Sequence, residues 1–243
     1  MNYLIDNIKF CKHPGCRSHV THPCESCGRI QGRKQIVAII GGSFNPIHNG
    51  HVDLGLYILK HNLADKVFYM PCYNHAFGKN LLSGKVRIDM IDKSIEDYEN
   101  MFSFPFEIEN GYHCNTYNTI NKLYEKYQDS PYIFKYVLGL DCALYIHNWN
   151  DWEDLTNLIP FIVFSRKGYT TDLNQWFNKE PHIFVFDEDS DIPDVSSSNI
   201  KNLIKYFYCG RVKENIILDN INPKVFEYIK NNNLYRGDIN GNS

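Results

Sequence analysis

The sequence predicts an α/β protein whose core is a doubly wound parallel β-sheet, and three observations support this fold class. From residue 35 on, short apolar segments alternate with longer amphipathic stretches, which is the order of strands and helices in such folds. The segment 36–40 (IVAII) is apolar throughout, as expected of a strand that helices cover on both faces. Glycines and polar residues follow this strand and the strand expected at 133–138, at the carboxyl ends where such sheets bind ligands.

Turn and capping residues set the limits of the predicted elements. Pro71 ends the second strand, and Ser83 can cap the helix that follows it. Pro105 allows a strand at 104–108 only at a sheet edge or at a strand start. Asn222 and Pro223 mark the start of the last helix. Strands are thus expected at 36–40, 66–70, 104–108, 133–138, 161–164 and 183–186, and helices at 50–60, 84–95, 115–127, 151–158, 196–206 and from 223 on.

The composition narrows the class of partner. A formal charge of −3, from 25 basic and 28 acidic residues, gives no basic surplus of the kind that nucleic-acid-binding proteins show. No run of eighteen apolar residues indicates a membrane span, and the first ten residues lack the features of a signal peptide. We therefore expect a cytoplasmic protein that binds neither a membrane nor, over its surface as a whole, nucleic acid, while a local basic patch stays open. The oligomeric state stays open, a homo-oligomer included.

Residues 1–34 differ in composition from the rest of the chain. The segment 11–33 contains four cysteines and three histidines but only two aliphatic residues, so burial alone cannot order it. Because thiolate sites order such short segments, we expect a structural Zn²⁺ bound by Cys11, Cys16, Cys24 and Cys27. Unligated cysteines are the alternative. The role of this Cys-rich appendage stays open between binding a partner, contacting nucleic acid and stabilising the N-terminus.

The chain divides into three predicted regions. The Cys-rich appendage covers residues 1–34, the main α/β domain covers 35–236, and a disordered tail covers 237–243. The asparagine-rich end, which includes residues 231–233, is expected to be frayed.

The segment 41–51 (GGSFNPIHNGH) joins the first predicted strand to the first predicted helix. Two glycines after a buried strand allow the backbone to approach a ligand closely. His48 and His51 are three residues apart, so both imidazoles lie on one side of the first helical turn. A helix N-terminus attracts phosphate through its free N–H groups and its dipole. An isolated HxxH would more simply be two surface histidines, but between this strand and this helix it predicts an anion site.

This segment resembles the signature of the HxGH nucleotidyltransferase superfamily. Further segments occur in the order found in nicotinate or nicotinamide mononucleotide adenylyltransferases: TYNT at 116–119, GLD at 139–141 followed by Trp149, FIVFSRKGY at 161–169, VSSSNIK at 195–201 and NPKVFEYIKNNNLY at 222–235. The resemblance covers about residues 36–236 and implies a Rossmann-like nucleotidyltransferase fold. It also implies an enzyme of NAD biosynthesis that transfers the adenylyl group of ATP to a pyridine mononucleotide and releases pyrophosphate.

The resemblance also implies roles for individual residues. His48 and His51 would be catalytic, binding the triphosphate and stabilising charge on the α-phosphoryl group. The ATP site would comprise Gly41, Gly42, Ser43, Phe44, His48, His51, Asp141, Ser196, Ser198 and Lys201, and the mononucleotide site Asn45, His75, Lys79, Arg87, Thr116, Tyr117, Thr119, Trp149 and Arg166. Lys201 stands where the family more often has arginine, and a lysine lacks the bidentate fork. Mg²⁺ would accompany the ATP phosphates.

Several alternatives stay open. A serine at 196–198 can simply cap a helix, Trp149 can be a core residue, and Arg87 can form a salt bridge on a helix surface. The segment 71–79 can be a mobile polar loop. A pantetheine-phosphate adenylyltransferase or a cytidylyltransferase would share the histidine motif, and a zinc-dependent binding module without turnover would share the fold. The sequence does not decide between nicotinate and nicotinamide.

Overall fold

The structure is a computed structural model that describes residues 34–74, 78, 80–113, 115–172, 174–186 and 195–236. Six parallel strands form one sheet in the order β3-β2-β1-β4-β5-β6. The strand order reverses between β1 and β4, which is the switch point of a doubly wound sheet. The predicted α/β class with a doubly wound parallel sheet is therefore confirmed, while residues 1–33 of the predicted Cys-rich appendage lie outside the described residues. The strands are β1 (Gln35–Gly42), β2 (Lys66–Pro71), β3 (Met101–Ser103), β4 (Tyr132–Gly139), β5 (Phe161–Phe164) and β6 (Ile183–Val185).

Most helices begin where their capping residues predict. Ser83 accepts a hydrogen bond from the Val86 amide, and Asn222 accepts one from the Lys224 amide. The α-helices are α1 (Asn49–Lys60), α2 (Gly84–Ile95), α3 (Phe106–Asn110), α4 (Thr116–Tyr127), α5 (Leu140–Leu144), α6 (Trp152–Leu158), α7 (Ser197–Tyr208), α8 (Glu214–Leu218) and α9 (Pro223–Asn231). Two short 3₁₀-helices, η1 (Ile146–Asn148) and η2 (Trp176–Asn178), complete the described elements.

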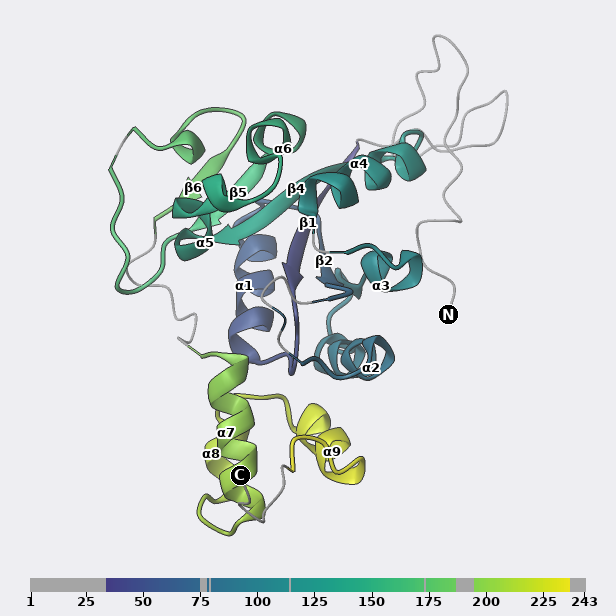
Figure 1. The fold of residues 1–243 in the computed structure, drawn as a ribbon, viewed down its shortest axis with the longest axis vertical. Coiled ribbons are helices and arrows are strands. Elements are labelled where there is room, and N and C mark those ends of the chain that lie inside the picture. The colour runs from purple at the N-terminus through teal and green to yellow at the C-terminus, as the bar shows by residue number, and fades with distance from the viewer. Residues whose placement is uncertain are drawn as a thin grey trace.

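Two apolar cores lie on opposite faces of the sheet, because successive strand residues point to opposite sides. In β1, Ala38 and Ile40 belong to the core that α1, α2, α7, α8 and α9 cover. Val37 and Ile39 belong to the other core, which α3, α4, α5 and α6 cover. This arrangement explains why residues 36–40 of β1 are all apolar. Figure 1 shows α7, α8 and α9 together at one end of the molecule, beside the N-terminal end of α1.

The predicted edge strand at 104–108 is wrong. The edge strand β3 ends at Ser103, and α3 begins directly after Pro105. The Phe104 amide still donates to the Tyr69 carbonyl at 2.8 Å, but the backbone of Pro105 (φ −75°, ψ 30°) is no longer extended, so the strand ends there. Phe104 and Phe106 both enter the core, with stacked rings 5.5 Å apart. Phe104 and Phe106 therefore show the alternating apolar pattern of a strand, although this segment does not form one.

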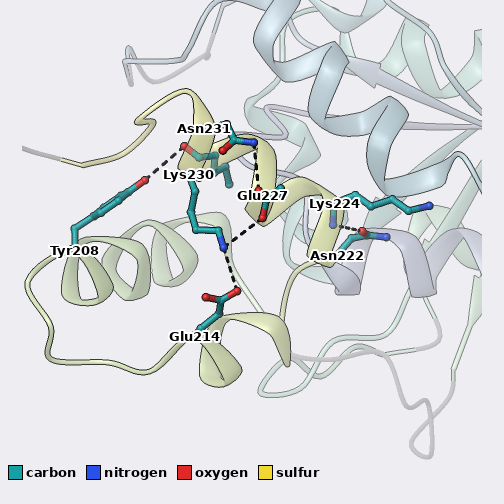
Figure 2. A network of polar contacts seen from close by, with 8 residues as sticks. Tyr208, Glu214, Asn222, Lys224, Glu227, Lys230 and Asn231 are labelled. Atoms are coloured by element: carbon teal, nitrogen blue, oxygen red, sulfur yellow. Dashed lines mark hydrogen bonds and ion pairs between the residues drawn. The ribbon is translucent and has the colours of Figure 1, made fainter.

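The asparagine-rich segment 231–233 is not frayed, contrary to the sequence prediction. Asn231 is the last residue of α9, and the Asn232 side chain donates to the Tyr228 carbonyl at 2.9 Å. Lys230 lies between the carboxylates of Glu214 and Glu227, at 3.2 and 3.3 Å, and joins α9 to α8 (Figure 2). Helix α8 itself was missed, because five residues are too few to show a helical period.

Some predictions lie outside the described residues. These are the zinc ligands Cys11, Cys16, Cys24 and Cys27, the loop residues His75 and Lys79, and the tail 237–243. Within the described part of the chain, no helix is long and apolar enough to cross a membrane.

Candidate active site

The loop between β1 and α1, residues 43–48, leaves the sheet at its switch point. Neighbouring side chains explain why the two positions before this loop are glycines. A Cβ at Gly41 would collide with the Tyr136 hydroxyl. A Cβ at Gly42 would lie only 3.2 Å from the ring of Phe44. Phe44 is fully buried and has a left-handed backbone (φ 45°), which is rare for a bulky residue. The loop is thus folded tightly over the end of β1.

His48 and His51 lie together where α1 begins. Their rings stack with centroids 3.7 Å apart, and the His51 Nδ1 accepts a hydrogen bond from the His48 amide at 3.3 Å. His48 is only 6% exposed. Among the described residues, its buried Nδ1 has no hydrogen-bond partner. A buried polar atom without a partner costs stability, so it marks a place where a ligand or water can bind.

The electrostatic surroundings keep both imidazoles neutral at neutral pH. Burial lowers the pKa of His48 to about 4, with a further lowering from the Arg166 guanidinium. Burial also lowers the pKa of His51 well below 6.5, as do the neighbouring His48 and Arg166. Arg166 follows β5 and the two histidines follow β1, so charged and polar groups from the ends of two strands lie close together. Such a cluster favours a multiply charged anion, whose binding would raise both imidazole pKa values again.

Arg166 also contacts the end of β4. Its Nη1 donates to the Asp141 Oδ2 in an ion pair across the ends of β4 and β5. The other oxygen, Oδ1, is buried without a partner among the described residues. Gly139 makes this position possible, because a Cβ there would lie 2.5 Å from that oxygen. The predicted residues Asp141 and Arg166 are therefore brought together.

The start of α7 lies against the β1–α1 loop. Ser196 caps α7 by accepting a hydrogen bond from the Asn199 amide at 3.2 Å. Ser197, which the sequence reading did not select, donates from its hydroxyl to the Pro46 carbonyl at 2.8 Å. This bond brings the N-terminus of α7, with Ser198 and Lys201 in its first turns, next to the histidine loop. Three consecutive serines give no sequence signal for which one turns inward.

Asn45 and Arg87 turn into the protein. Asn45 is 3% exposed, and its side chain bonds to Tyr235, Leu82 and Asn80. Arg87 is 1% exposed, so the alternative of a surface salt bridge is wrong. Its guanidinium donates to the carbonyls of Leu82, Ser43 and Cys72 at 3.0, 2.8 and 2.7 Å. Both side chains therefore hold the β1–α1 loop in place, whether or not they also face a substrate.

Three of the residues predicted for the mononucleotide site, Thr116, Tyr117 and Thr119, lie in the first turn of α4. The Asn115 side chain donates to Asp151 at 3.2 Å and brings the starts of α4 and α6 together. Thr116 and Tyr117 are half-buried there, and the Thr116 hydroxyl is hydrogen-bonded with Tyr136. Trp149 is half-buried and packs against the core beneath α4 and α6, so it combines a core contact with an exposed part.

Thr119 bonds to a buried carboxylate that the sequence reading missed. Its hydroxyl donates to the Glu107 Oε1 at 3.1 Å, and the other oxygen accepts from the Tyr73 amide at 3.2 Å. Burial raises the pKa of Glu107, and the two hydrogen bonds partly oppose that shift. Glu107 was assigned to a strand that does not exist, which hid its place on α3. It ties the segment after β2 to α4.

The described residues do not form a metal cage. No group of three or more His, Cys, Asp or Glu side chains within the described ranges could hold a metal ion.

The sheet order and the histidine pair at its switch point are those of an α/β nucleotidyltransferase. The family model described as cytidylyltransferase-like matches residues 39–203, which is well over half of the chain. The match includes the β1–α1 loop, Asp141, Arg166 and the start of α7. The chain therefore belongs to the cytidylyltransferase-like family.

Named relatives narrow the comparison. A probable nicotinate-nucleotide adenylyltransferase of Clostridium botulinum (strain Alaska E43) is 28% identical over 205 residues, which cover 82% of this chain and 96% of that protein. A relative of the same name from strain Okra is 28% identical over 208 residues. The solved nicotinic acid mononucleotide adenylyltransferase of Plasmodium falciparum, complexed with NaAD, has a TM-score of 0.72 at 23% identity. The matched region covers 85% of this chain and 100% of the solved chain, which shows that the two proteins share a fold.

The lowered pKa of His48 predicts a pH-dependent stability. An unfolded histidine titrates near 6.5 and the folded one near 4, so the unfolded chain takes up the proton first as the pH falls. The contribution of His48 to the free energy of unfolding is therefore complete above pH 6.5. It falls by about 2–3 kcal/mol as the pH is lowered toward 4. Urea unfolding at pH 7 and 4.5 should show this loss in the native protein and a smaller loss in His48→Asn. Equal losses in both proteins would contradict the assignment.

Proposed function

We propose that this chain transfers the adenylyl group of ATP to the 5′-phosphate of nicotinate mononucleotide and releases pyrophosphate. The stacked pair of buried His48 and half-buried His51 beside Arg166 carries the proposal, because it provides an anion site at the switch point of the sheet. The choice of acceptor is supported by the names of the relatives, which match this chain over nearly their whole length.

In this proposal an oxygen of the mononucleotide phosphate attacks the α-phosphorus of ATP. The bond to the bridging oxygen of the β-phosphate breaks, and pyrophosphate leaves with the electron pair. Such transfers depend mainly on positioning and on charge stabilisation, rather than on covalent help from the protein. His48, His51 and Arg166 donate to phosphate oxygens, and the N-terminus of α7 adds its amides and the Ser198 hydroxyl.

The other predicted residues bind the two organic parts of the substrates. Asp141 would accept hydrogen bonds from the adenosine ribose through its partnerless Oδ1. The group around Thr116, Tyr117 and Trp149 would enclose the mononucleotide, with the indole stacking on the pyridine ring. Mg²⁺ would enter as part of the ATP substrate and neutralise phosphate charge.

The proposal is tested with purified protein, ATP and three acceptors: nicotinate mononucleotide, nicotinamide mononucleotide and phosphopantetheine. We expect pyrophosphate and dinucleotide in equal amounts with a pyridine mononucleotide, and the highest kcat/KM with the nicotinate form. Turnover with phosphopantetheine alone would identify a different transferase. ATP binding without pyrophosphate from any acceptor would support a binding module instead.

A further inference from the structure

The β1–α1 loop contacts the C-terminal unit, which we define as residues 195–236 and which contains α7, α8 and α9. The start of α7 contacts the loop through the bond from Ser197 to the Pro46 carbonyl at 2.8 Å. The Asn49 amide, at the start of α1, donates to the carbonyl of Asn220, in the link before α9, at 2.9 Å. The end of the unit contacts Asn45 through the Tyr235 hydroxyl at 2.7 Å. These contacts join segments that are more than 150 residues apart in the chain.

Tyr235 reaches the loop only because the chain turns back after α9. Asn233 and Tyr235 both have left-handed backbones, with φ values of 50° and 58°. For a tyrosine this conformation costs energy, and it persists only where the surroundings hold it. The Leu234 amide donates to the Ile229 carbonyl at 3.0 Å and fixes the turn. Burial raises the pKa of Tyr235, so its hydroxyl stays a hydrogen-bond donor at all physiological pH values.

The side chain of Asn45 depends on Tyr235 more than on its other partners. Its Oδ1 accepts from Tyr235 at 2.7 Å but from the Leu82 amide at 3.4 Å, and its Nδ2 donates to the Asn80 carbonyl at 3.4 Å. Hydrogen bonds near 3.4 Å are weak compared with those near 2.8 Å. Without the tyrosine hydroxyl, this buried amide would keep only long contacts, three residues before His48.

The C-terminal unit also has contacts that do not involve the β1–α1 loop. Lys230 joins α9 to α8 through Glu214, and the Tyr208 hydroxyl donates to the Ile229 carbonyl at 3.5 Å (Figure 2). The Tyr228 hydroxyl donates to the Asp89 Oδ2 at 2.9 Å and fixes α9 to α2. The unit is therefore anchored both internally and to the sheet domain.

We propose that Tyr235 is a positioning residue for adenylyl transfer, which sets the backbone of the β1–α1 loop through Asn45 and thereby the place of His48 and His51. The inference rests on the proposed function for its effect on turnover but not for its effect on the loop. A loop displaced by a fraction of an ångström leaves ATP bound and lowers the rate of the chemical step.

The test is Tyr235→Phe, which keeps the ring and removes the hydroxyl. Its matched control is Tyr228→Phe, which removes a comparable tyrosine bond from the same unit at a place remote from the loop. We expect kcat to fall about tenfold in Tyr235→Phe, with less than about a threefold change in the KM for ATP. Tyr228→Phe should keep the native kcat and lose similar stability in urea.

Amide hydrogen exchange provides a readout that needs no turnover. Exchange across residues 43–48 should become faster in Tyr235→Phe and stay unchanged in Tyr228→Phe. Equal kcat losses in the two variants, or native kcat and native loop exchange in Tyr235→Phe, would overturn the proposal. If the native protein shows no turnover with any acceptor, the proposed function fails, while the exchange comparison still decides whether Tyr235 holds the loop.

Discussion

Replacing His51 by alanine is expected to lower kcat by about 10²–10³-fold, the effect of removing one donor from a charge-stabilising site. The half-buried imidazole stacks on His48 with ring centroids 3.7 Å apart and lies within the field of Arg166. The loss should appear in kcat rather than in the KM of the mononucleotide, because the charge develops only in the transition state. Steady-state kinetics of pyrophosphate release measures both values.

His51 also has a structural bond, which a second variant separates from catalysis. Its Nδ1 accepts from the His48 amide, and the Oδ1 of an asparagine occupies nearly the same place. His51→Asn should therefore keep the cap of α1 but lose the outer ring nitrogen, and it should be about as inactive as the alanine variant. Activity restored by asparagine would show that His51 acts only by holding the loop.

Replacing Arg87 by leucine is expected to lower the free energy of unfolding by about 3–5 kcal/mol. The guanidinium is 1% exposed and donates to three backbone carbonyls, which would all lose their partner in one step. Leucine fills part of the volume but has no donor. Urea unfolding of the native and variant proteins measures the difference.

A lysine on the same helix provides the control for this prediction. Lys85 is exposed and forms an i,i+4 pair with Asp89, so Lys85→Ala should change stability by less than about 0.5 kcal/mol. A loss below about 1 kcal/mol in Arg87→Leu, together with a raised KM for the mononucleotide, would contradict the structural role. It would support the substrate contact that the family resemblance implies.

The sheet could be predicted because its strands leave a strong trace in the sequence. IVAII, which Gly41 follows, and FIVF, which Pro160 precedes, lie in strands covered on both faces, and short apolar segments of this kind are typical of such strands. The segment 104–108 failed for the same reason, since Phe104 and Phe106 are also buried. Apolar spacing reports burial, and it does not report whether the backbone between the buried residues is extended.

The parts of the candidate site that lie within one short segment could be predicted from the sequence. The parts that depend on contacts with backbone groups far away in the chain could not. His48 and His51 are three residues apart, so their stacking follows from local geometry. The partners of Arg87 are carbonyl groups, and every residue has one, so no pattern could single them out. Tyr235 likewise meets Asn45 only after the chain has folded over 190 residues.

The central claim is that the two imidazoles of the β1–α1 loop bind the triphosphate. Nitrogen-15 NMR of the histidine rings, titrated with pH in the presence and absence of a non-hydrolysable ATP analogue, tests it directly. The account predicts that saturating analogue shifts the His48 and His51 resonances and raises the pKa of His48 from about 4 toward or above 6.5. Unchanged resonances and an unchanged pKa with the analogue bound would contradict the account.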